Sequence, residues 1–390
     1  MNRNLIVIPQ DIQEYGNYIY SLIEKSDDRN PLKISLLNKT TYYTDFIDCM
    51  IHIHKELSDK ECDAILIDKL QLSRNDYDED KYYEAATEFS VILHTFCIKH
   101  SAFDYEESQN KGITDKKPEC SVVSTTGNKF IVEAKCPVQA IENFETQTGQ
   151  TFIFKNAGRA ESLQEQKKFL KTMNDDLATQ NASVVQGKCT DNKMLDFLQS
   201  ASQKFSLDNN ANELNILFVA LDSVNQIQDW VNYFYFNKGF FTTNSFAADE
   251  PYCYADRKKK ETYVEPHFKN VHFVVFTNNY YRHKNNSVIN GSAWYLCDGF
   301  NIALQNPFVN MEDKKETIIE YFTYLGVYTK DIQNYEMPCS PDIQKDVLDA
   351  IKITSFVKAE LEEKQGVYYW DIPKVDLQEN KKDETNSNNP

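Results

Sequence analysis

Two glutamates and a lysine lie in one short stretch of the chain and are of the types needed for metal-assisted hydrolysis. Thirteen residues separate Glu119 from Glu133, and Lys135 follows two positions later. Carboxylates are oxygen ligands of the kind that Mg²⁺ takes in proteins. An adjacent lysine can orient a water molecule or stabilise charge on a phosphate oxygen. This combination predicts a site that hydrolyses a phosphodiester with the help of a divalent cation.

The three side chains can act together only if the chain between them folds back as a β-hairpin. Two β-prone runs flank a short turn-like segment here. Alternate residues of a strand share a face, so Glu133 and Lys135 project together. A three-residue loop ending at a left-handed Gly127 sets Glu119 across from Glu133. A two-residue turn would instead set Glu119 across from Ala134, and we favour the first register because of the position of the glycine.

Two carboxylates that face each other across a hairpin repel, and a divalent cation between them offsets that cost. We therefore expect that replacing Glu119 or Glu133 with Ala leaves the protein folded, because each change removes a repelling charge. The alternative interpretation of the same residues is an ordinary solvated strand face with a cross-strand ion pair.

Hydrophobic periodicity predicts the elements that surround the hairpin. One strongly amphipathic helix precedes it, and another helix follows it. Two later runs are apolar throughout, which is typical of strands covered on both faces. This order predicts an α/β protein with a mixed β-sheet flanked by helices. The predicted helices span 81–100, 161–180, 313–328 and 342–363, and the buried strands span 215–223 and 271–277.

The hairpin sequence resembles the motif of the PD-(D/E)XK nuclease superfamily, which includes many restriction endonucleases. The resemblance rests on Pro118-Glu119, the gap of thirteen residues and Glu133-Ala134-Lys135. It implies a restriction-endonuclease-like core of a helix, a three-stranded meander, a second helix and a further strand, with helical additions at both ends. Glu119 stands where the family usually has Asp. No Gln-x-x-x-Tyr follows in the next helix, so the exonuclease branch with that signature is not supported.

The same resemblance implies roles for particular residues. In this family the first helix often contributes a further acid, and the helix after the motif often contributes a Gln or Lys that faces the site. The implied cofactor is Mg²⁺, for which Mn²⁺ should substitute. The candidates are Glu119 and Glu133 as metal ligands, Lys135 as the catalytic lysine, Glu84 or Glu88 as the further acid, and Gln164 with Lys168 from the later helix.

The chain is acidic overall, with 42 Lys and Arg against 59 Asp and Glu and a net charge of −17. A field of this sign repels phosphates, so an enzyme of this composition that acts on nucleic acid must concentrate positive charge locally. Most charge runs are solvated loops, but two basic clusters have tyrosine neighbours and could contact phosphates and stack on bases. They contain Arg257, Lys258, Lys259 and Lys260 in one case, and Arg282 and Lys284 in the other.

Length and composition indicate a soluble globular protein of one to three structural units. The nine cysteines include no Cys-x-x-Cys pair, and no apolar run approaches the length of a membrane span. Both observations favour a cytoplasmic protein without a membrane anchor. We expect a mostly helical region over 1–75, a nuclease-like core with insertions over 76–305, a helical region over 306–375 and a disordered tail over 376–390.

These observations predict a cytoplasmic, Mg²⁺-dependent endonuclease that cuts DNA, with RNA as the alternative substrate. A role in restriction or anti-phage defence, with a partner protein or as a homo-oligomer, is implied by the family resemblance alone. The competing hypothesis is a non-catalytic recognition or assembly subunit built on the same fold.

Overall fold

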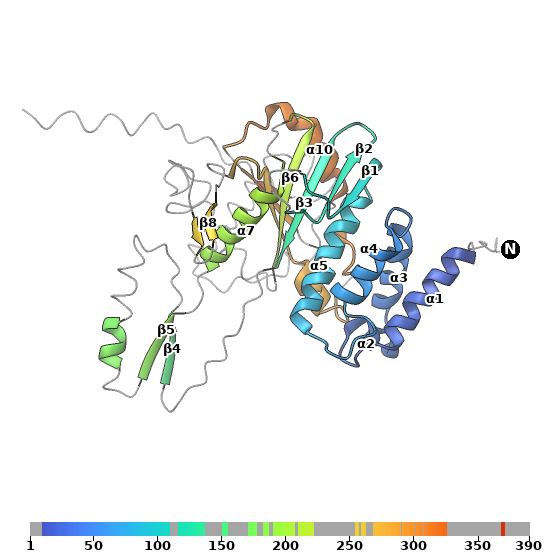
Figure 1. The fold of residues 1–390 in the computed structure, drawn as a ribbon, viewed down its shortest axis with the longest axis horizontal. Helices are drawn as coiled ribbons and strands as arrows, with labels where there is room; N and C mark the ends of the chain where they lie inside the picture. The colour runs from blue at the N-terminus through green and yellow to red at the C-terminus, as the bar shows by residue number, and fades with distance from the viewer. Residues whose placement is uncertain are drawn as a thin grey trace, which may run out of the picture.

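A central sheet with helices packed beside it dominates the protein (Figure 1). In this computed structural model the N-terminal part of the chain is described nearly without a break, and later parts are described in segments. The described residues are 10–109, 116–136, 150–154, 171–177, 182–186, 190–206, 210–221, 254–256, 259–262, 268–289, 291–299, 301–306, 308–325 and 368–370.

The N-terminal part is a layer of helices, in agreement with the helical character expected there. Buried side chains of this layer, such as Phe46 and Met50, belong to the same continuous hydrophobic core as Phe89 and strand residues further along the chain. The layer and the sheet therefore fold around one core. The helices are α1 (Gln10–Glu24), α2 (Pro31–Asn38), α3 (Thr41–Ile53), α4 (Asp59–Asp63) and the π-helix η1 (Ala64–Lys69).

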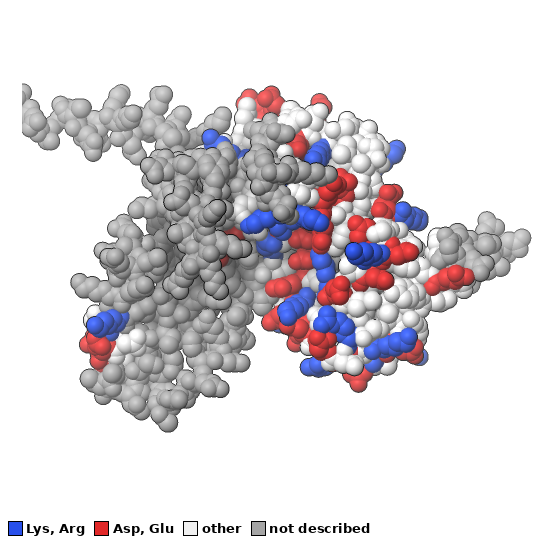
Figure 2. Space-filling view, in the orientation of Figure 1, with Lys and Arg blue, Asp and Glu red and all other residues white. Residues whose placement is uncertain are grey.

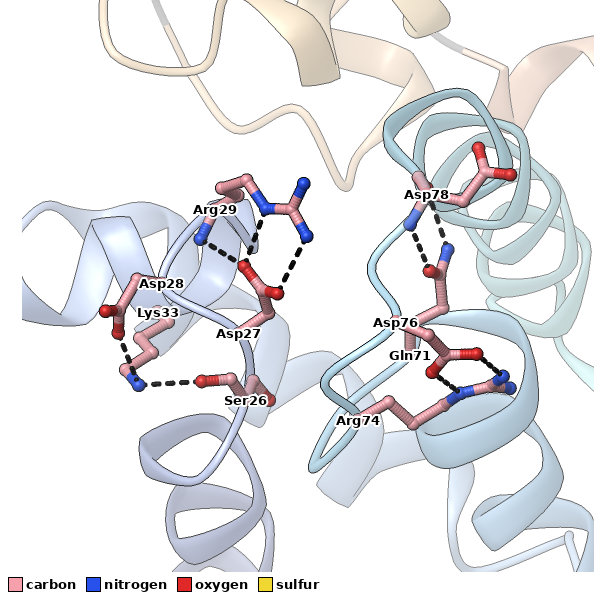
Figure 3. A network of polar contacts seen from close by, with 9 residues as sticks. All are labelled: Ser26, Asp27, Asp28, Arg29, Lys33, Gln71, Arg74, Asp76 and Asp78. Atoms are coloured by element: carbon pink, nitrogen blue, oxygen red, sulfur yellow. Dashed lines mark hydrogen bonds and ion pairs between the residues drawn. The ribbon is translucent and has the colours of Figure 1, made fainter.

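Side-chain contacts hold two loops of this layer, after α1 and after η1 (Figure 3). In the first loop, the guanidinium of Arg29 binds the carboxylate of Asp27 at 2.9 Å. In the second, the side-chain amide of Gln71 donates to the carbonyl of Asp78 at 2.9 Å and accepts from its N–H at 2.7 Å. Asp78 also caps the next helix by accepting from the N–H of Lys81. These bonds fix where that helix begins relative to η1.

Helix α5 (Glu79–Phe96) is the helix that the sequence predicted over 81–100. The side chains of Ala85, Phe89, Ile92 and Phe96 are all buried. They share a core with Phe130, Val132 and Ala134 of the hairpin. The predicted apolar face is therefore confirmed, and it packs against the sheet.

The sheet has seven strands among the described residues, in the order β1-β2-β3-β6-β9-β10-β11. The pairs β1–β2, β2–β3 and β9–β10 are antiparallel, while β3–β6, β6–β9 and β10–β11 are parallel. The predicted α/β class with a mixed sheet is thus confirmed. The strands are β1 (His100–Tyr105), β2 (Cys120–Ser124), β3 (Lys129–Lys135), β6 (Glu213–Ala220), β9 (Phe273–Thr277), β10 (Asn301–Gln305) and β11 (Tyr368–Trp370).

Helices cover the sheet from both sides, with α5 and α7 (Thr190–Lys204) on opposite sides of β3 (Figure 1). Alternation along β3 places Val132 beneath α5 and its neighbours Ile131 and Glu133 on the other face. Lys204, at the end of α7, contacts Glu133 on that face. The buried side of α7 consists of Met194, Leu198 and Ala201, with Phe205 directly after the helix.

The element order of helix, three-stranded meander, helix and strand is present as α5, β1–β2–β3, α7 and β6. The second helix of this order is α7, which begins at Thr190, after β4 and β5. Of the helix predicted over 161–180, only 171–177 are described, and these residues are helical. The second helix that packs near the hairpin therefore lies later in the chain than the sequence suggested.

The remaining elements are short. The helix predicted over 313–328 is present as η4 and α10, while the helix predicted over 342–363 and the tail over 376–390 lie outside the described residues. The division of the chain into domains stays a prediction. These elements are β4 (Gln150–Phe154), β5 (Ala182–Gln186), β7 (Tyr254–Asp256), β8 (Lys259–Thr262), α9 (Asn279–Lys284), η3 (Leu296–Asp298), η4 (Glu312–Lys314) and α10 (Lys315–Tyr324).

Candidate metal centre on the β2–β3 hairpin

The β2–β3 hairpin has the register that the three-residue loop predicts. Cys120 is paired with Val132, and the N–H of Glu119 donates to the carbonyl of Val132 at 3.0 Å. Continuing this register by one residue sets Glu119 across from Glu133. Gly127 closes the loop with φ of 89°, in the left-handed region that favours glycine. The predicted register is confirmed, and the two-residue turn is excluded.

The two carboxylates and the lysine of the hairpin lie on one face of the sheet. The ammonium of Lys204 is 2.5 Å from Oε1 of Glu133 and 4.0 Å from Oε1 of Glu119. The ammonium of Lys135 is 2.6 Å from the same Oε1 of Glu133. The end of helix α7 therefore lies beside the hairpin and places a second lysine next to the one that the motif contains.

Glu133 is the most deeply buried member of this group, with 0% of its side chain exposed. Both lysine ammoniums bind its Oε1. Its Oε2 is also buried and has no hydrogen-bond partner among the described residues. A buried carboxylate oxygen left without a donor is costly, and it is the kind of atom that a cation or an ordered water satisfies.

A third lysine binds the carboxylates at the other end of the site. The ammonium of Lys69, at the end of η1, is 2.7 Å from Oε1 of Glu106, 3.3 Å from Oε2 of Glu88 and 3.6 Å from Oε2 of Glu119. It also lies 5.6 Å from the centre of the Tyr105 ring. Lys69 therefore links α5, strand β2 and the end of β1 through one ammonium.

Burial and charge both shift the proton affinities in this cluster. Burial, together with the charges of Glu88 and Glu133, raises the pKa of Glu119 to about 8. Burial by itself would lower the pKa of Lys69, but the surrounding carboxylates, Glu119 foremost, raise it above its ordinary value. The pKa of Lys135 is raised in the same way: burial by itself would lower it, but Glu133, Glu119 and Glu88 together outweigh that effect. Lys69 and Lys135 thus stay charged, whereas the raised pKa of Glu119 favours its protonated form.

The described part of the cluster has more negative than positive groups. Its ion pairs join four carboxylates to three ammoniums, so one negative charge is left over when every group is ionised. With every group ionised, a bound divalent cation would change the net charge of the cluster from −1 to +1, and its positive charge would favour the ionised form of Glu119. The members are Glu88, Glu106, Glu119 and Glu133, with Lys69, Lys135 and Lys204.

The carboxylate oxygens of the site suit one Mg²⁺ ion that keeps several water ligands better than a metal ion whose ligands all come from the protein. Among the residues that the structure describes, no group of three or more His, Cys, Asp or Glu side chains is arranged to hold a metal ion. Mg²⁺ usually keeps several waters and binds through one or two carboxylates plus substrate phosphates. Glu119 matches that pattern together with Oε2 of Glu133, which has no hydrogen-bond partner among the described residues.

The structure separates the two candidates for a further acid on α5. Glu88 and Glu119 both form ion pairs with the ammonium of Lys69. Glu88 also raises the pKa of Lys135. Glu84 lies one turn earlier, and both acids raise the pKa of Cys136, just beyond the hairpin. Glu88 is therefore the acid of α5 that the ion pairs join to the site.

The other candidate residues are outside the described chain or away from the site. Gln164, Lys168, Arg257 and Lys258 lie outside the described residues, and Lys259 and Lys260 are described only as backbone of β8. Arg282 corrects the sequence prediction, because its side chain is 1% exposed and donates to the carbonyl of Ser292 at 3.4 Å. A guanidinium buried in this way is not free to contact a nucleic acid, whereas Lys284 is exposed.

Sequence reasoning missed Lys69, Lys204 and Glu106. A signal for α7 was available, because Met194, Leu198, Ala201 and Phe205 have the 4, 3, 4 spacing of one helix face. That pattern predicts the helix and leaves Lys204 at its end, close to the start of β6. No comparable signal marks Lys69 or Glu106, since each reaches the site from a segment with no recognisable motif.

Charges of both signs are mixed over the face shown in Figure 2, where the described Lys and Arg residues are interspersed with Asp and Glu. This arrangement differs from the wide basic surface of proteins that bind nucleic acid through charge alone. Among the described residues, the positive charge beside the hairpin carboxylates comes from Lys69, Lys135 and Lys204.

Comparisons of the chain with protein-family models, with curated proteins and with solved structures find no match. The roles implied by the resemblance of the hairpin motif therefore stay predictions. No described helix combines the length and the apolar character needed to cross a membrane.

Proposed function

We propose that this protein is a Mg²⁺-dependent endonuclease with a restriction-endonuclease-like core that hydrolyses phosphodiester bonds of DNA. The observation that carries the proposal is the open Oε2 of Glu133, a fully buried carboxylate oxygen with no hydrogen-bond partner among the described residues. It shares a sheet face with Glu119 and Lys135. The order of α5, β1–β2–β3, α7 and β6 supports the fold, and a role in restriction or anti-phage defence follows from the same resemblance.

In this proposal, Glu119 and Glu133 hold the metal ion and Lys135 acts on the substrate. The bound Mg²⁺ supplies Lewis acidity toward a phosphate oxygen and lowers the pKa of a coordinated water. Lys135 is charged and 23% exposed, so its ammonium can reach a phosphate oxygen and stabilise the charge that develops there. Lys204 binds the same Oε1 of Glu133 as Lys135 and keeps the carboxylate oriented.

A cleavage assay on the full-length protein tests the proposal. Supercoiled, linear and single-stranded DNA and single-stranded RNA are each incubated with Mg²⁺, Mn²⁺ or EDTA. We expect metal-dependent nicking or cutting of DNA by the wild type and none by Glu133→Gln, whose folded fraction is matched by lowering the assay temperature. Lys25→Met, which removes an exposed lysine of the N-terminal helical layer, is the matched control and should cut normally. Equal cleavage by wild type and Glu133→Gln would refute the proposed chemistry.

A non-catalytic recognition or assembly subunit is the second candidate, and one observation favours it. Three ammoniums already bind the carboxylates of the hairpin cluster, so the cluster is close to neutral without a metal ion. In that case the cluster is a buried ion-pair network that joins η1, α5 and α7 to the sheet. Isothermal titration with Mn²⁺ distinguishes the two candidates, because a purely structural network binds no divalent ion.

A further inference from the structure

The segment that carries Lys69 has an unusual backbone. Lys69 is the last residue of η1, and single π-helical turns occur frequently at functional sites. Two residues that follow, Gln71 and Ser73, have φ of 58° and 57°, in the left-handed region that non-glycine residues seldom adopt. The amide of Gln71 is bound on both sides by the backbone of Asp78 (Figure 3). This backbone holds the lysine at one fixed place beside the start of α5.

Lys69 is surrounded as a bound cation would be. Carboxylate oxygens of Glu106, Glu88 and Glu119 lie 2.7, 3.3 and 3.6 Å from its ammonium and come from three different segments. Glu106 and Glu88 lie within hydrogen-bond distance of the ammonium, and Glu119 lies within ion-pair distance. The ring of Tyr105 covers a further side at 5.6 Å.

We propose that the Lys69 ammonium takes the place of a second divalent cation, so that the hairpin site binds a single metal ion. This inference rests on the proposed nuclease site and concerns how many ions it holds. Lys69 binds Oε2 of Glu88 and Oε1 of Glu106, and a divalent ion cannot approach these two oxygens to 2.0–2.6 Å while the ammonium remains. The carboxylates of the hairpin that can bind the divalent ion are Glu133, through Oε2, and Glu119.

The same lysine prepares Glu119 for that ion. Lys69 attracts Oε2 of Glu119, while Oε1 of Glu119 lies toward Lys204 and Glu133. The carboxylate is thereby held between the two ends of the site before any metal arrives. Lys69 is therefore a positioning residue, because it acts through Glu119 and Glu88 rather than on the substrate.

The test is the number of Mn²⁺ ions bound per full-length chain, measured by isothermal titration calorimetry and checked by equilibrium dialysis. We expect one ion for the wild type. Lys69→Met keeps an unbranched side chain that is one atom shorter and removes its charge, and we expect it to bind two ions. Its melting temperature should rise more on adding Mn²⁺ than that of the wild type, because the second ion replaces the missing ammonium.

Three further variants serve as controls. Lys69→Arg retains the positive charge and should stay at one ion. Lys204→Met removes a cation from the Glu133 end, so it should also stay at one ion, bound more tightly. Lys284→Met removes an exposed charge outside the site and should match the wild type in both number and affinity.

Each result has a distinct meaning. A wild type that binds no Mn²⁺ overturns the proposed nuclease site together with this inference. A wild type that binds two ions, or a Lys69→Met protein that binds one with unchanged affinity, overturns the inference alone. A Lys69→Met protein that stays unfolded at saturating Mn²⁺ also overturns it, because a divalent ion would then be unable to take the place of the ammonium.

Discussion

Replacing Glu133 with Gln removes one buried charge while keeping the shape of the side chain. In the folded protein that charge binds the ammoniums of Lys135 and Lys204 at 2.6 and 2.5 Å. Removing one partner of a buried ion pair typically costs about 3–5 kcal/mol. The two lysine side chains are 23% and 17% exposed, so water solvates part of their charge once Glu133 is neutral. We therefore expect the free energy of unfolding to fall by about 2–3 kcal/mol.

Urea denaturation in EDTA, followed by circular dichroism, measures this loss without any contribution from metal binding. A loss of this size lowers the melting temperature by roughly 4–12 °C in a domain of moderate size. Adding Lys204→Met to Glu133→Gln should destabilise the protein by less than the sum of the two single changes, with a coupling of about 1–2 kcal/mol. Glu56→Gln, at an exposed turn, is the matched control and should change stability by less than about 0.5 kcal/mol.

Whether Glu133→Gln lowers or raises the free energy of unfolding distinguishes two physical descriptions of the hairpin. If the two glutamates repelled each other without compensation, as the sequence alone suggested, Glu133→Gln would leave stability unchanged or raise it. Wild-type stability of Glu133→Gln in EDTA would therefore refute the conclusion that two ammoniums stabilise this carboxylate. Strict additivity with Lys204→Met would refute the specific pairing with α7.

Three further predictions follow from single features of the structure. Lys135→Met should keep Mn²⁺ binding but slow DNA cleavage by about 10²–10³-fold, because one donor to the developing charge is lost, and single-turnover rates at saturating Mn²⁺ measure this. Gly291→Ala should destabilise the protein more than Gly127→Ala in a thermal melt. Both glycines have positive φ, but a Cβ at 291 would lie 2.5 Å from Oδ2 of Asp298, whereas a Cβ at 127 would have no atom within 4 Å. Burial lowers the pKa of three histidines to about 3, so below pH 6.5 the unfolded state binds more protons than the folded state. Stability should then fall by about 1.4 kcal/mol per pH unit for each histidine down to about pH 3, and urea midpoints that stay level between pH 7 and pH 5 would contradict this. The histidines are His94, His272 and His283.

The parts of the fold that sequence predicted well depend on neighbours along the chain. The position of Gly127 is a local feature that sets the loop length, and loop length sets the pairing of Glu119 with Glu133. The spacing of Phe89 and Ile92 on one face of α5 is equally local, and both side chains are buried. Alternation along β3 then determines which face carries Lys135. Each of these inferences needs only backbone preferences and side-chain periodicity.

Arg282 shows where local pattern fails. Its neighbours in sequence are basic and aromatic, which suggested an exposed cluster, but α9 directs this side chain into the interior and Lys284 outward. A run of charges says nothing about which member of a short helix meets the core, because that depends on how the helix is docked on the rest of the protein.

The amino-acid sequence by itself determined that two glutamates and a lysine share one face of a hairpin in an α/β protein. Only the tertiary structure decided what surrounds them. Lys204 reaches Glu133 across 71 positions of the chain, and Lys69 reaches Glu119 from a π-helix in the N-terminal layer. Such long-range pairs depend on how α7 and η1 pack against the sheet, and this packing sets which carboxylate oxygens are occupied by ammoniums and leaves Oε2 of Glu133 open.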